Sequence, residues 1–308
     1  MHIGIVGAGN VSIGIADALA YLGIGKKITI YNRHIDKTLG EVWDLNDSIP
    51  LLDGTQEFKA TNSYEDLKTC EVVAVCAGAK QKPNQTRLEL IDQNYKIIKD
   101  IIFNLDRVNK EAKIIIVTNP VDILTRVAIR YSNREKNHIF GSGTVLDSIR
   151  LREAIGENIK INRKNIHAYI IGEHGDSEFP LWSACKIGPL PLESFNIDKN
   201  FKDEIAKQVR ERAYKIIQKK NFTKQAIGTS VAYLIKSILY DERSIFTVSV
   251  PIENICGCIK KDVCLSLPCI IGKNGIEKKL SIKCKDKEFE KLKISANKLE
   301  EAYKKIGD

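Results

Sequence analysis

The sequence lacks the features that mark exported and membrane-spanning proteins. Residues 1–7 lead directly into an apolar segment typical of a strand, without the charged start, long apolar core and cleavage site of a secretory signal. No uncharged apolar run approaches the ~20 residues that a helix needs to cross a bilayer. We therefore expect a cytoplasmic protein with no membrane association.

The cysteines lack the spacing of a metal site. None of the eight forms a CxxC pair, and no histidine stands beside them at the spacing of zinc ligands. Cys256 and Cys258 are the one close pair, and free cysteine is more often a small residue of an apolar core. We expect no metal, and reduced thiols in a reducing compartment.

Aromatic residues are also scarce, at 7% of the 308 residues, and no stacking motif of a nucleic-acid binder is present. The formal net charge is +9, but the lysines are interleaved with Asp and Glu along the chain. This pattern favours a lysine-rich solvated surface over a nucleic-acid interface. Such a surface still attracts small anions.

The first half of the chain alternates short apolar strands with helical patterns. The predicted strands, all rich in Val and Ile, are 2–6, 27–31, 72–76 and 113–118. Apolar residues recur at helical spacing over 13–20 and again over 91–105. Strands without polar alternation are typical of a sheet that is buried on both faces. The pattern therefore predicts an α/β fold with a doubly wound parallel sheet and right-handed crossovers.

A glycine-rich turn at 7–12 links the first predicted strand to the first helix. Gly7 permits the tight turn, and Gly9 lets a pyrophosphate approach the N–H groups at the start of the helix. Ser12 replaces the third glycine of the pattern and is still small enough for close packing of helix on strand. The strand–turn–helix context predicts a Rossmann dinucleotide-binding domain, although a turn of this kind without a ligand is the alternative.

Asn32 occupies the place of the residue that usually selects the cofactor. It follows the second predicted strand, roughly 20 residues beyond the glycines, where an acid normally binds the ribose hydroxyls. An aspartate would repel a 2′-phosphate, whereas asparagine does not. Arg33 either pairs with such a phosphate or points to solvent. The choice between NAD and NADP therefore stays open here.

The second half of the chain has a different character. Its strand patterns are 166–171 and 244–250, and its long polar helices are 201–219 and 287–305. We predict a dinucleotide-binding domain at 1–141 and an α+β substrate domain at 142–308. No linker-like segment separates the two halves, so we expect them to pack tightly.

Several segments carry further motifs of polar and charged residues. They are 77–87, 118–122, 146–152, 172–176 and 261–268. Together with the glycine turn, and in this order over nearly the whole chain, they resemble the lactate/malate dehydrogenase family. The resemblance implies an NAD(P)-dependent 2-hydroxy-acid oxidoreductase. A nucleotide-binding protein that kept the fold without the activity is the alternative from another class.

The resemblance assigns proton transfer to His174 and Asp147. Imidazole titrates near neutral pH, so His174 can give a proton to a ketone or take one from an alcohol. Asp147 would hold the ring and stabilise its protonated form. The alternatives are a structural histidine and an acid in the first turn of a helix that begins near 142–144.

Three further polar residues are implied to contact the substrate. Arg150 lies on the same helix face as Asp147, and its planar fork suits the substrate carboxylate. Arg87, on a segment that predicts a mobile loop, would close over the substrate and polarise its carbonyl. Asn119 would contact the substrate oxygen or the nicotinamide. Without these companions, a solvated arginine and a turn before Pro120 would be the ordinary interpretations.

Gln81 and Thr223 are implied to select the substrate. Malate enzymes of the family resemble one another in having Arg at the place of Gln81, and lactate enzymes have Gln. Gln81 offers no charge to pair with the second carboxylate of oxaloacetate, and an unpaired charge in a closed site is costly. The resemblance therefore implies pyruvate and L-lactate. Branched 2-oxo acids stay open, because one methylene changes binding by only ~1–3 kcal/mol.

The resemblance also implies a set of cofactor contacts made by small side chains and backbone. These positions are Gly7, Gly9, Val11, Asn32, Gly78, Ala79, Val117, Asn119 and Ser142.

Arg152 and His167 match an effector site in the bacterial lactate dehydrogenases. There the two positions bind fructose 1,6-bisphosphate at a two-fold interface. Arg152 lies two residues past Arg150 and so faces nearly the opposite side of the helix. The resemblance implies a homotetramer in which paired subunits present both residues to one bisphosphate, which would favour the active state. The alternative is a surface arginine and an ordinary histidine.

Overall fold

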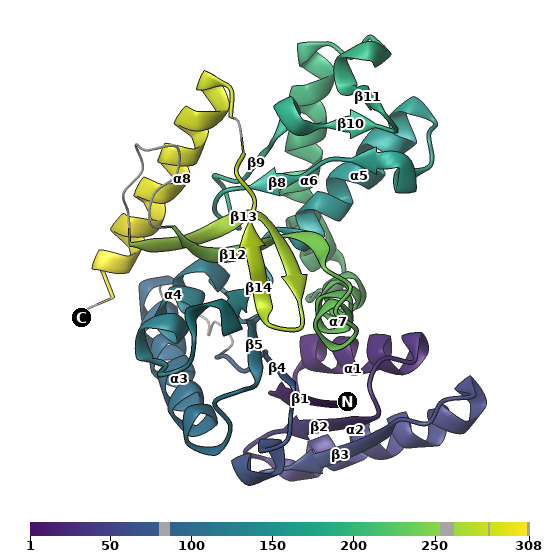
Figure 1. Ribbon diagram of the computed structural model, residues 1–308, viewed down its shortest axis with the longest axis vertical. Helices are drawn as coiled ribbons and strands as arrows, with labels where there is room; N and C mark the ends of the chain where they lie inside the picture. Colours follow the sequence, from purple (N-terminus) through teal and green to yellow (C-terminus); the bar gives the residue numbers. More distant parts are fainter. Residues whose placement is uncertain (80–86, 253–261, 283, 307–308) are drawn as a thin grey trace.

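The computed structural model describes residues 1–79, 87–252, 262–282 and 284–306, and Figure 1 shows their arrangement. A central sheet runs through the described part of the molecule. Its strands are β1 (His2–Val6), β2 (Lys27–Tyr31), β3 (Glu57–Thr61), β4 (Val72–Val75), β5 (Lys113–Ile116), β6 (Ile139–Gly141), β12 (Ser244–Ile252), β13 (Val263–Gly272) and β14 (Gly275–Lys279). They lie in the order β14-β13-β12-β6-β5-β4-β1-β2-β3.

The part of this sheet from β3 to β6 is parallel throughout. The helices that connect its strands are α1 (Asn10–Leu22), α2 (Ile35–Ser48), α3 (Arg87–Val108) and α4 (Val121–Tyr131). Every residue of β1 and β4 is buried, as expected where helices cover both faces of a sheet. The predicted α/β, Rossmann-like architecture is confirmed. Strands β4 and β5 end slightly before the bounds that the sequence predicts.

The edge strand β3 is the one parallel strand for which the sequence offers no apolar run. Its exposed Glu57 and Lys59 alternate with the buried Phe58 and Ala60. Such alternation is typical of a strand with only one covered face. β3 pairs with β2 alone, so its charged residues point away from the core at the rim of the sheet.

The C-terminal strands extend the same sheet rather than forming a separate one. β12 pairs antiparallel with β6 through Ser249 and Gly141, and β13 and β14 continue the antiparallel part outward. This arrangement joins the two halves of the chain through continuous backbone pairing. The expected tight packing of the halves follows from it.

A second, smaller layer lies beside the sheet (Figure 1). Its helices are α5 (Val145–Ile159) and α6 (Lys199–Lys220), and its short strands are β7 (Ile166–His167), β8 (Ile170–Ile171), β9 (Phe179–Pro180), β10 (Lys186–Ile187) and β11 (Leu190–Pro191). An apolar cluster of its own, including Leu151, Ile155 and Ile205, holds this layer together. It covers only part of the segment 142–308 in which the sequence predicts an α+β domain, since β12, β13 and β14 belong to the central sheet.

The single strand predicted at 166–171 is wrong. The chain instead forms β7 and β8, which belong to different sheets. Helix α5 supplies the physical reason, because its side chains take up backbone groups at the break. Arg152 donates from Nε to the carbonyl of Ala168 at 3.1 Å, and Ser148 Oγ accepts from the Ile170 N–H at 2.9 Å. These groups are then unavailable for continuous strand pairing.

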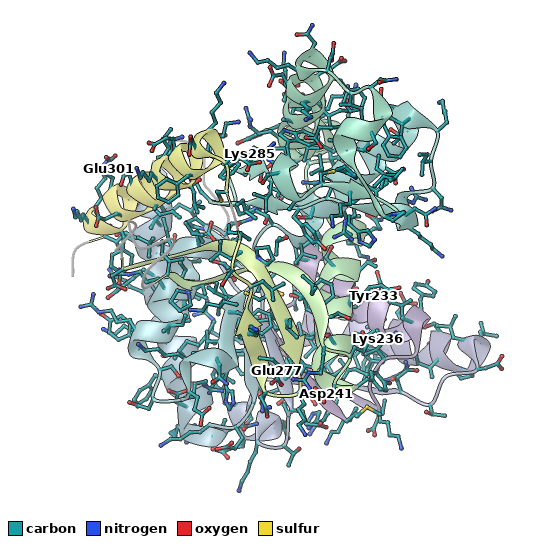
Figure 2. All side chains as sticks on the ribbon, turned by 45° about the horizontal axis from the view of Figure 1, so that its top comes forward. Tyr233, Lys236, Asp241, Glu277, Lys285 and Glu301 are labelled. Atoms are coloured by element: carbon teal, nitrogen blue, oxygen red, sulfur yellow. The ribbon has the colours of Figure 1, made fainter. Side chains whose placement is uncertain are left out.

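Two C-terminal helices complete the fold, α7 (Gln225–Leu239) and α8 (Asp286–Lys304). Helix α7 packs against α1 so closely that a Cβ at Gly228 would lie 2.1 Å from the carbonyl oxygen of Gly14. Figure 2 shows Tyr233 and Lys236 on α7, and Glu301 on α8 well away from them. Among the described residues, every helix is too short or too polar to cross a lipid bilayer.

Candidate active site

The turn after β1 has the backbone geometry that a dinucleotide requires. Gly7 has φ +112°, and a Cβ there would lie 2.9 Å from the Ala77 nitrogen. Gly9 directly precedes α1, and apart from its chain neighbours no described atom lies within 4 Å of the place where its Cβ would be. In the part of the chain that the structure describes, no side chain caps the N-terminus of α1. Its first N–H groups are therefore open to a pyrophosphate, which the helix dipole also favours.

A cavity of about 600 Å³ extends from this turn along the ends of the parallel strands. Of the predicted cofactor residues, it is lined by Gly7, Gly9, Asn32, Gly78 and Ala79. The other predicted cofactor residues, which do not line it, are Val11, Val117, Asn119 and Ser142. The small lining residues and the open helix start fit the adenosine and pyrophosphate of NAD.

Asn94 of α3, which sequence reasoning missed, connects the loop after β4 to the loop after β5. Its buried side chain accepts the N–H of Ala79 at Oδ1, at 2.7 Å, and donates from Nδ2 to the carbonyl of Asn119 at 3.1 Å. Asn119 itself accepts the N–H of Val121 at 3.2 Å through Oδ1. This bond is the turn role that the sequence offered as the ordinary alternative, and it leaves the Asn119 amide nitrogen for a ligand.

The structure brings His174, Asp147 and Arg150 together. Asp147 is 2% exposed and lies in the first turn of α5. His174 donates from Nδ1 to Asp147 Oδ2 at 2.8 Å, and Arg150 donates from Nη1 to Asp147 Oδ1, also at 2.8 Å. The carboxylate thus orients the imidazole on one side and the guanidinium on the other. Nε2 of His174 is left to exchange a proton with a substrate.

Asp122 fixes the backbone of the same histidine. It follows β5 at the start of α4, and its Oδ2 accepts the His174 N–H at 2.7 Å. Its Oδ1 accepts from the Ser249 hydroxyl of β12 at 2.5 Å. Burial raises the pKa of Asp122 to about 6, although both hydrogen bonds oppose this shift. The sequence placed Asp122 in a motif but gave it no role.

A second carboxyl group, Glu178, lies beside the imidazole. Glu178 is 7% exposed, and its Oε2 is 4.0 Å from His174 Nδ1. The turn after His174 returns here, since the N–H of Glu178 donates to the carbonyl of Gly175 at 3.2 Å. Glu178 follows His174 by four residues, and this spacing could have pointed to it as a neighbour of the imidazole. The sequence analysis did not use it.

These neighbours control the charge of the imidazole. Burial lowers the pKa of His174, but the charge and hydrogen bond of Asp147, with smaller contributions from Glu178 and Asp122, outweigh it and raise the pKa to about 9. Burial and the charge of Asp147 raise the pKa of Glu178 to about 8. Despite its burial, Asp147 has a lowered pKa, because His174 and Arg150 stabilise its charge. At neutral pH the site therefore holds an imidazolium against an ionised Asp147.

The same three groups have the composition of a metal site but not its free ligand atoms. One ligand atom from each of Asp147, His174 and Glu178 lies within 4.8 Å of the others. Both oxygens of Asp147 and Nδ1 of His174 are already committed to hydrogen bonds among these residues and Arg150. A hydrogen-bonded proton-transfer cluster describes them better than a metal centre.

A cavity of about 340 Å³ opens beside His174. Its walls include Pro120, directly after β5, and one residue each of α4, α3 and α8, namely Asp122, Ile91 and Leu299. Because α3 also lines the cofactor cavity, the two hollows are neighbours along this helix. His174 lines this cavity, whereas Asp147 and Arg150 do not.

The other predicted substrate residues, Gln81, Arg87 and Thr223, are described only in part. Gln81 lies outside the described residues, and so does the side chain of Arg87. The backbone of Arg87 begins α3, so the predicted loop ends there. Thr223 lies between α6 and α7, and no hydrogen bond, ion pair or shared cavity in the described part of the chain links it to His174.

Arg152 and His167 lie in neighbouring segments of the smaller layer. Arg152 bonds to the carbonyl of Ala168, and its guanidinium is 5.1 Å from the centre of the Tyr169 ring. Burial lowers the pKa of Arg152. His167 is exposed on β7. Arg152 is thus hydrogen-bonded to the residue that directly follows His167 in the chain.

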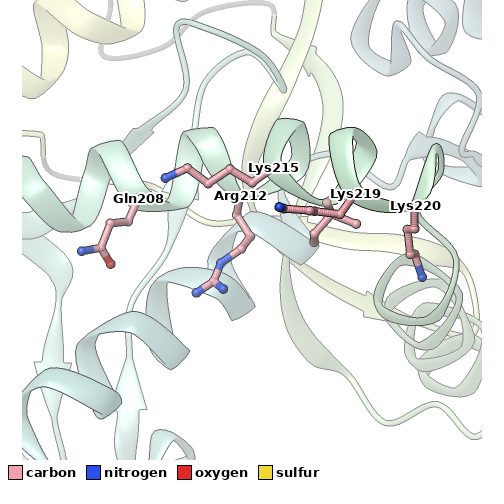
Figure 3. Close-up of a pocket in the computed structure, with 6 residues that line it drawn as sticks. Gln208, Arg212, Lys215, Lys219 and Lys220 are labelled. Carbon is pink, nitrogen blue, oxygen red and sulfur yellow. The ribbon is translucent and has the colours of Figure 1, made fainter.

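A basic groove on α6 is distinct from both cavities. Figure 3 shows its polar side chains along one side of the helix, and the groove has a volume of about 520 Å³. The lining residues are Gln208, Arg212, Lys215, Ile216, Lys219 and Lys220. Because one helix supplies all of them, the groove is a charged surface feature and not an enclosed binding site.

Comparison with known proteins connects this geometry to a family. Residues 1–141 match the lactate/malate dehydrogenase NAD binding domain, and residues 144–308 match the alpha/beta C-terminal domain of the same family. The chain belongs to the lactate/malate dehydrogenase family. NAD is accordingly the cofactor of its first domain.

Individual relatives of the family resemble the chain over almost its full length. It is 39% identical to an L-lactate dehydrogenase of Thermoanaerobacterium saccharolyticum, over 99% of this chain and 98% of the relative. An L-lactate dehydrogenase of Clostridium botulinum is also 39% identical, over 96% and 94% of the two chains.

Solved structures agree. A lactate dehydrogenase from a deep-sea metagenome of the Medee basin superposes with a TM-score of 0.96 at 32% identity, covering 100% of this chain and 99% of that one. The minor L-lactate dehydrogenase of Enterococcus mundtii, in a ligand-bound form, gives 0.95 at 28% identity, covering 99% and 98% of the two chains.

Proposed function

We propose that this chain is an L-lactate dehydrogenase that interconverts pyruvate and L-lactate with NAD(H). This proposal rests mainly on the 2.8 Å hydrogen bond from His174 Nδ1 to Asp147. The same carboxylate also accepts a hydrogen bond from Arg150. The names of the relatives at 39% identity support the same activity. We propose further that 1–141 binds the cofactor, that 142–308 supplies most of the substrate site, and that the enzyme works in the cytoplasm.

In pyruvate reduction, the bound nicotinamide supplies the hydride. His174 gives the proton from Nε2 to the carbonyl oxygen, and the ketone becomes an alcohol. Asp147 holds the ring through Nδ1 and stabilises its cation until the proton leaves. Arg150 binds the substrate carboxylate with the N–H groups that Asp147 does not use. In lactate oxidation the neutral imidazole takes the proton back.

Gln81 and Arg87 complete this proposal. Gln81 would favour pyruvate over oxaloacetate, because it brings no cation for a second carboxylate. Arg87 would polarise the carbonyl as the hydride arrives. Thr223 would contact the methyl group, and the cofactor residues outside the described cavity lining, such as Val117 and Ser142, would contact the nicotinamide end.

The test is a substrate panel under one set of conditions. Pyruvate, oxaloacetate and 4-methyl-2-oxopentanoate are each assayed with NADH by its absorbance. We expect the highest kcat/KM for pyruvate. A higher value for oxaloacetate or for the branched acid would reject the substrate assignment, and no turnover with any of them would reject the enzyme assignment.

We also propose that fructose 1,6-bisphosphate activates a homotetramer through Arg152 and His167. The exposure of His167 and the hydrogen bond of Arg152 to the next residue, Ala168, support a shared anion site. Like charges from paired subunits would repel until a polyanion binds. We expect the bisphosphate to lower the pyruvate concentration at half-saturation at pH 6. An unchanged saturation curve would reject this part of the proposal.

A further inference from the structure

The cofactor cavity has an unusual charge at the end of β2. Arg33 and Lys37 both line it, and both are exposed. Within the described part of the chain, no ion pair engages either of them. The residue between β2 and Arg33 is the uncharged Asn32. A dinucleotide places its adenosine ribose at this end of a Rossmann domain. The ribose hydroxyls therefore meet cations here instead of the usual carboxylate.

The local structure holds Asn32 in place. Its backbone N–H donates to the carbonyl of Thr61 at 2.9 Å, and its Nδ2 donates to the carbonyl of His34 at 2.7 Å. The amide oxygen is left to accept one hydroxyl group. Since Asn32 carries no negative charge, it does not repel a phosphate at that position.

Helix α2 adds to the same effect. It begins directly after His34, no side chain caps its N-terminus, and Lys37 lies in its first turn. The first N–H groups of a helix and its positive dipole end favour an anion. Asp36, in the same turn, opposes this in part. Among the lining residues, the charged groups on the facing helix α3 are Lys96 and Asp100, which offset each other. Arg33 and Lys37 therefore give the lining of the cavity a net positive charge.

We propose that Arg33 and Lys37 bind the 2′-phosphate of NADP(H), so that this cavity accepts both nicotinamide cofactors. The inference builds on the proposed dehydrogenase function and extends it to the phosphorylated cofactor. Guanidinium suits a phosphate through paired N–H donors, and the lysine adds a point charge. Discrimination between the cofactors is weak because Asn32 stands at the place where a carboxylate would reject the phosphate.

The direct test uses nucleotides that lack the reacting ring. Isothermal calorimetry compares adenosine 5′-phosphate with adenosine 2′,5′-bisphosphate, which differ only in the 2′-phosphate. We expect the bisphosphate to bind the wild-type protein at least as tightly as the monophosphate. Arg33→Ser should weaken the bisphosphate relative to the monophosphate by about tenfold, the loss of roughly one charge-assisted contact. Lys37→Ser should also weaken the binding of the bisphosphate relative to the monophosphate, by a smaller factor.

Asn32→Asp provides a second variant that removes no side-chain volume. The new carboxylate should repel the 2′-phosphate. We expect the affinity for the bisphosphate, relative to that for the monophosphate, to fall by at least tenfold. Arg107→Ser is the matched control, since Arg107 is an exposed arginine at the end of α3 outside the cavity lining. Arg107→Ser should leave the relative affinity for the two nucleotides as it is in the wild type. Thermal unfolding of each variant confirms that the proteins compared are folded.

Defined outcomes overturn the inference. It fails if the wild-type protein binds the bisphosphate more weakly than the monophosphate, or if neither Arg33→Ser nor Asn32→Asp changes the relative affinity for the two nucleotides. The proposed function fails separately, when neither NADH nor NADPH supports pyruvate reduction. Binding of the bisphosphate is measured without turnover, so the two failures are distinguishable.

Discussion

Glu178 Oε2 lies 4.0 Å from His174 Nδ1, on a side chain that is almost fully buried. The imidazole therefore faces a second carboxyl group besides the Asp147 to which it is hydrogen-bonded. The charges of His174, Arg150 and Arg210 favour the ionised form of Glu178, but burial and Asp147 outweigh them and raise its pKa. Glu178 therefore stays largely protonated at neutral pH and becomes charged only above about pH 8.

Glu178→Gln should shift the alkaline limit of pyruvate reduction to lower pH. Reduction needs the protonated imidazole, so it declines as pH rises through the His174 pKa of about 9. In that range Glu178 is ionised and stabilises the cation. Its replacement by an amide should lower the apparent pKa in kcat/KM by about one unit. Lactate oxidation, which needs neutral imidazole, should gain its activity at correspondingly lower pH.

The pH profiles of kcat/KM in both directions measure this shift. Glu211→Gln is the matched control, because Glu211 is an exposed α6 residue that pairs with Lys215. Its profile should coincide with that of the wild type. A Glu178→Gln profile that also coincides would show that the carboxyl group does not act on the imidazole.

Asp147→Asn should impair the reaction much more than it impairs folding. The amide cannot stabilise the imidazolium, and it changes the partner of Arg150 as well. We expect kcat/KM for pyruvate to fall by about 100-fold or more, as for the loss of an acid–base group. The alkaline limit should also move to lower pH. If steady-state kinetics shows less than a tenfold loss in a folded variant, Asp147 is not essential to proton transfer.

Asp122 gives a prediction about stability. Asp122→Ala leaves the His174 N–H and the Ser249 hydroxyl without their acceptor, at a cost of roughly 1–3 kcal/mol in the free energy of unfolding. Asp122→Asn keeps one acceptor oxygen and should cost less than half as much. Urea unfolding measures both values. Equal losses for the two variants would mean that the hydrogen bond to the backbone is not what Asp122 contributes.

The sequence was sufficient for the parts of the fold that depend on continuous burial. β1 and β2 have the predicted bounds because each is covered on both faces and has no polar alternation to obscure it. The segment 166–171 is also mostly apolar, apart from the exposed His167, but Ser148 and Arg152 of α5 bond to its backbone. No local pattern encodes a contact of that kind, so the division into two strands was not predictable.

The candidate site divides in the same way. His174, Asp147 and Arg150 were found because family motifs mark them, and the structure places them in one cluster. Glu178 and Asn94 have ordinary local surroundings, a polar turn and the middle of a long helix. Their proximity to the site depends on how the turn after His174 folds back and on which face α3 presents. Those are tertiary relationships that sequence spacing does not fix.

The two glycines of the cofactor turn should respond differently to the same substitution. Gly9 has extended backbone and open space at its Cβ position, so Gly9→Ala should fold with an unchanged Tm. Its methyl group would occupy the approach to the pyrophosphate, and we expect the Kd of NADH to rise by about tenfold or more. Gly7→Ala meets both a positive φ and the Ala77 backbone, so it should lower Tm before any ligand is added.

Thermal unfolding without cofactor and titration of NADH fluorescence separate the two effects. Both variants add one methyl group to the same turn, so a difference between them reflects the position and not the size of the change. A pair of variants with equal losses of Tm would place the strain elsewhere than at Gly7. An unchanged Kd in Gly9→Ala would mean that the phosphates do not approach the start of α1, and the cofactor would have to bind along a different face of the cavity.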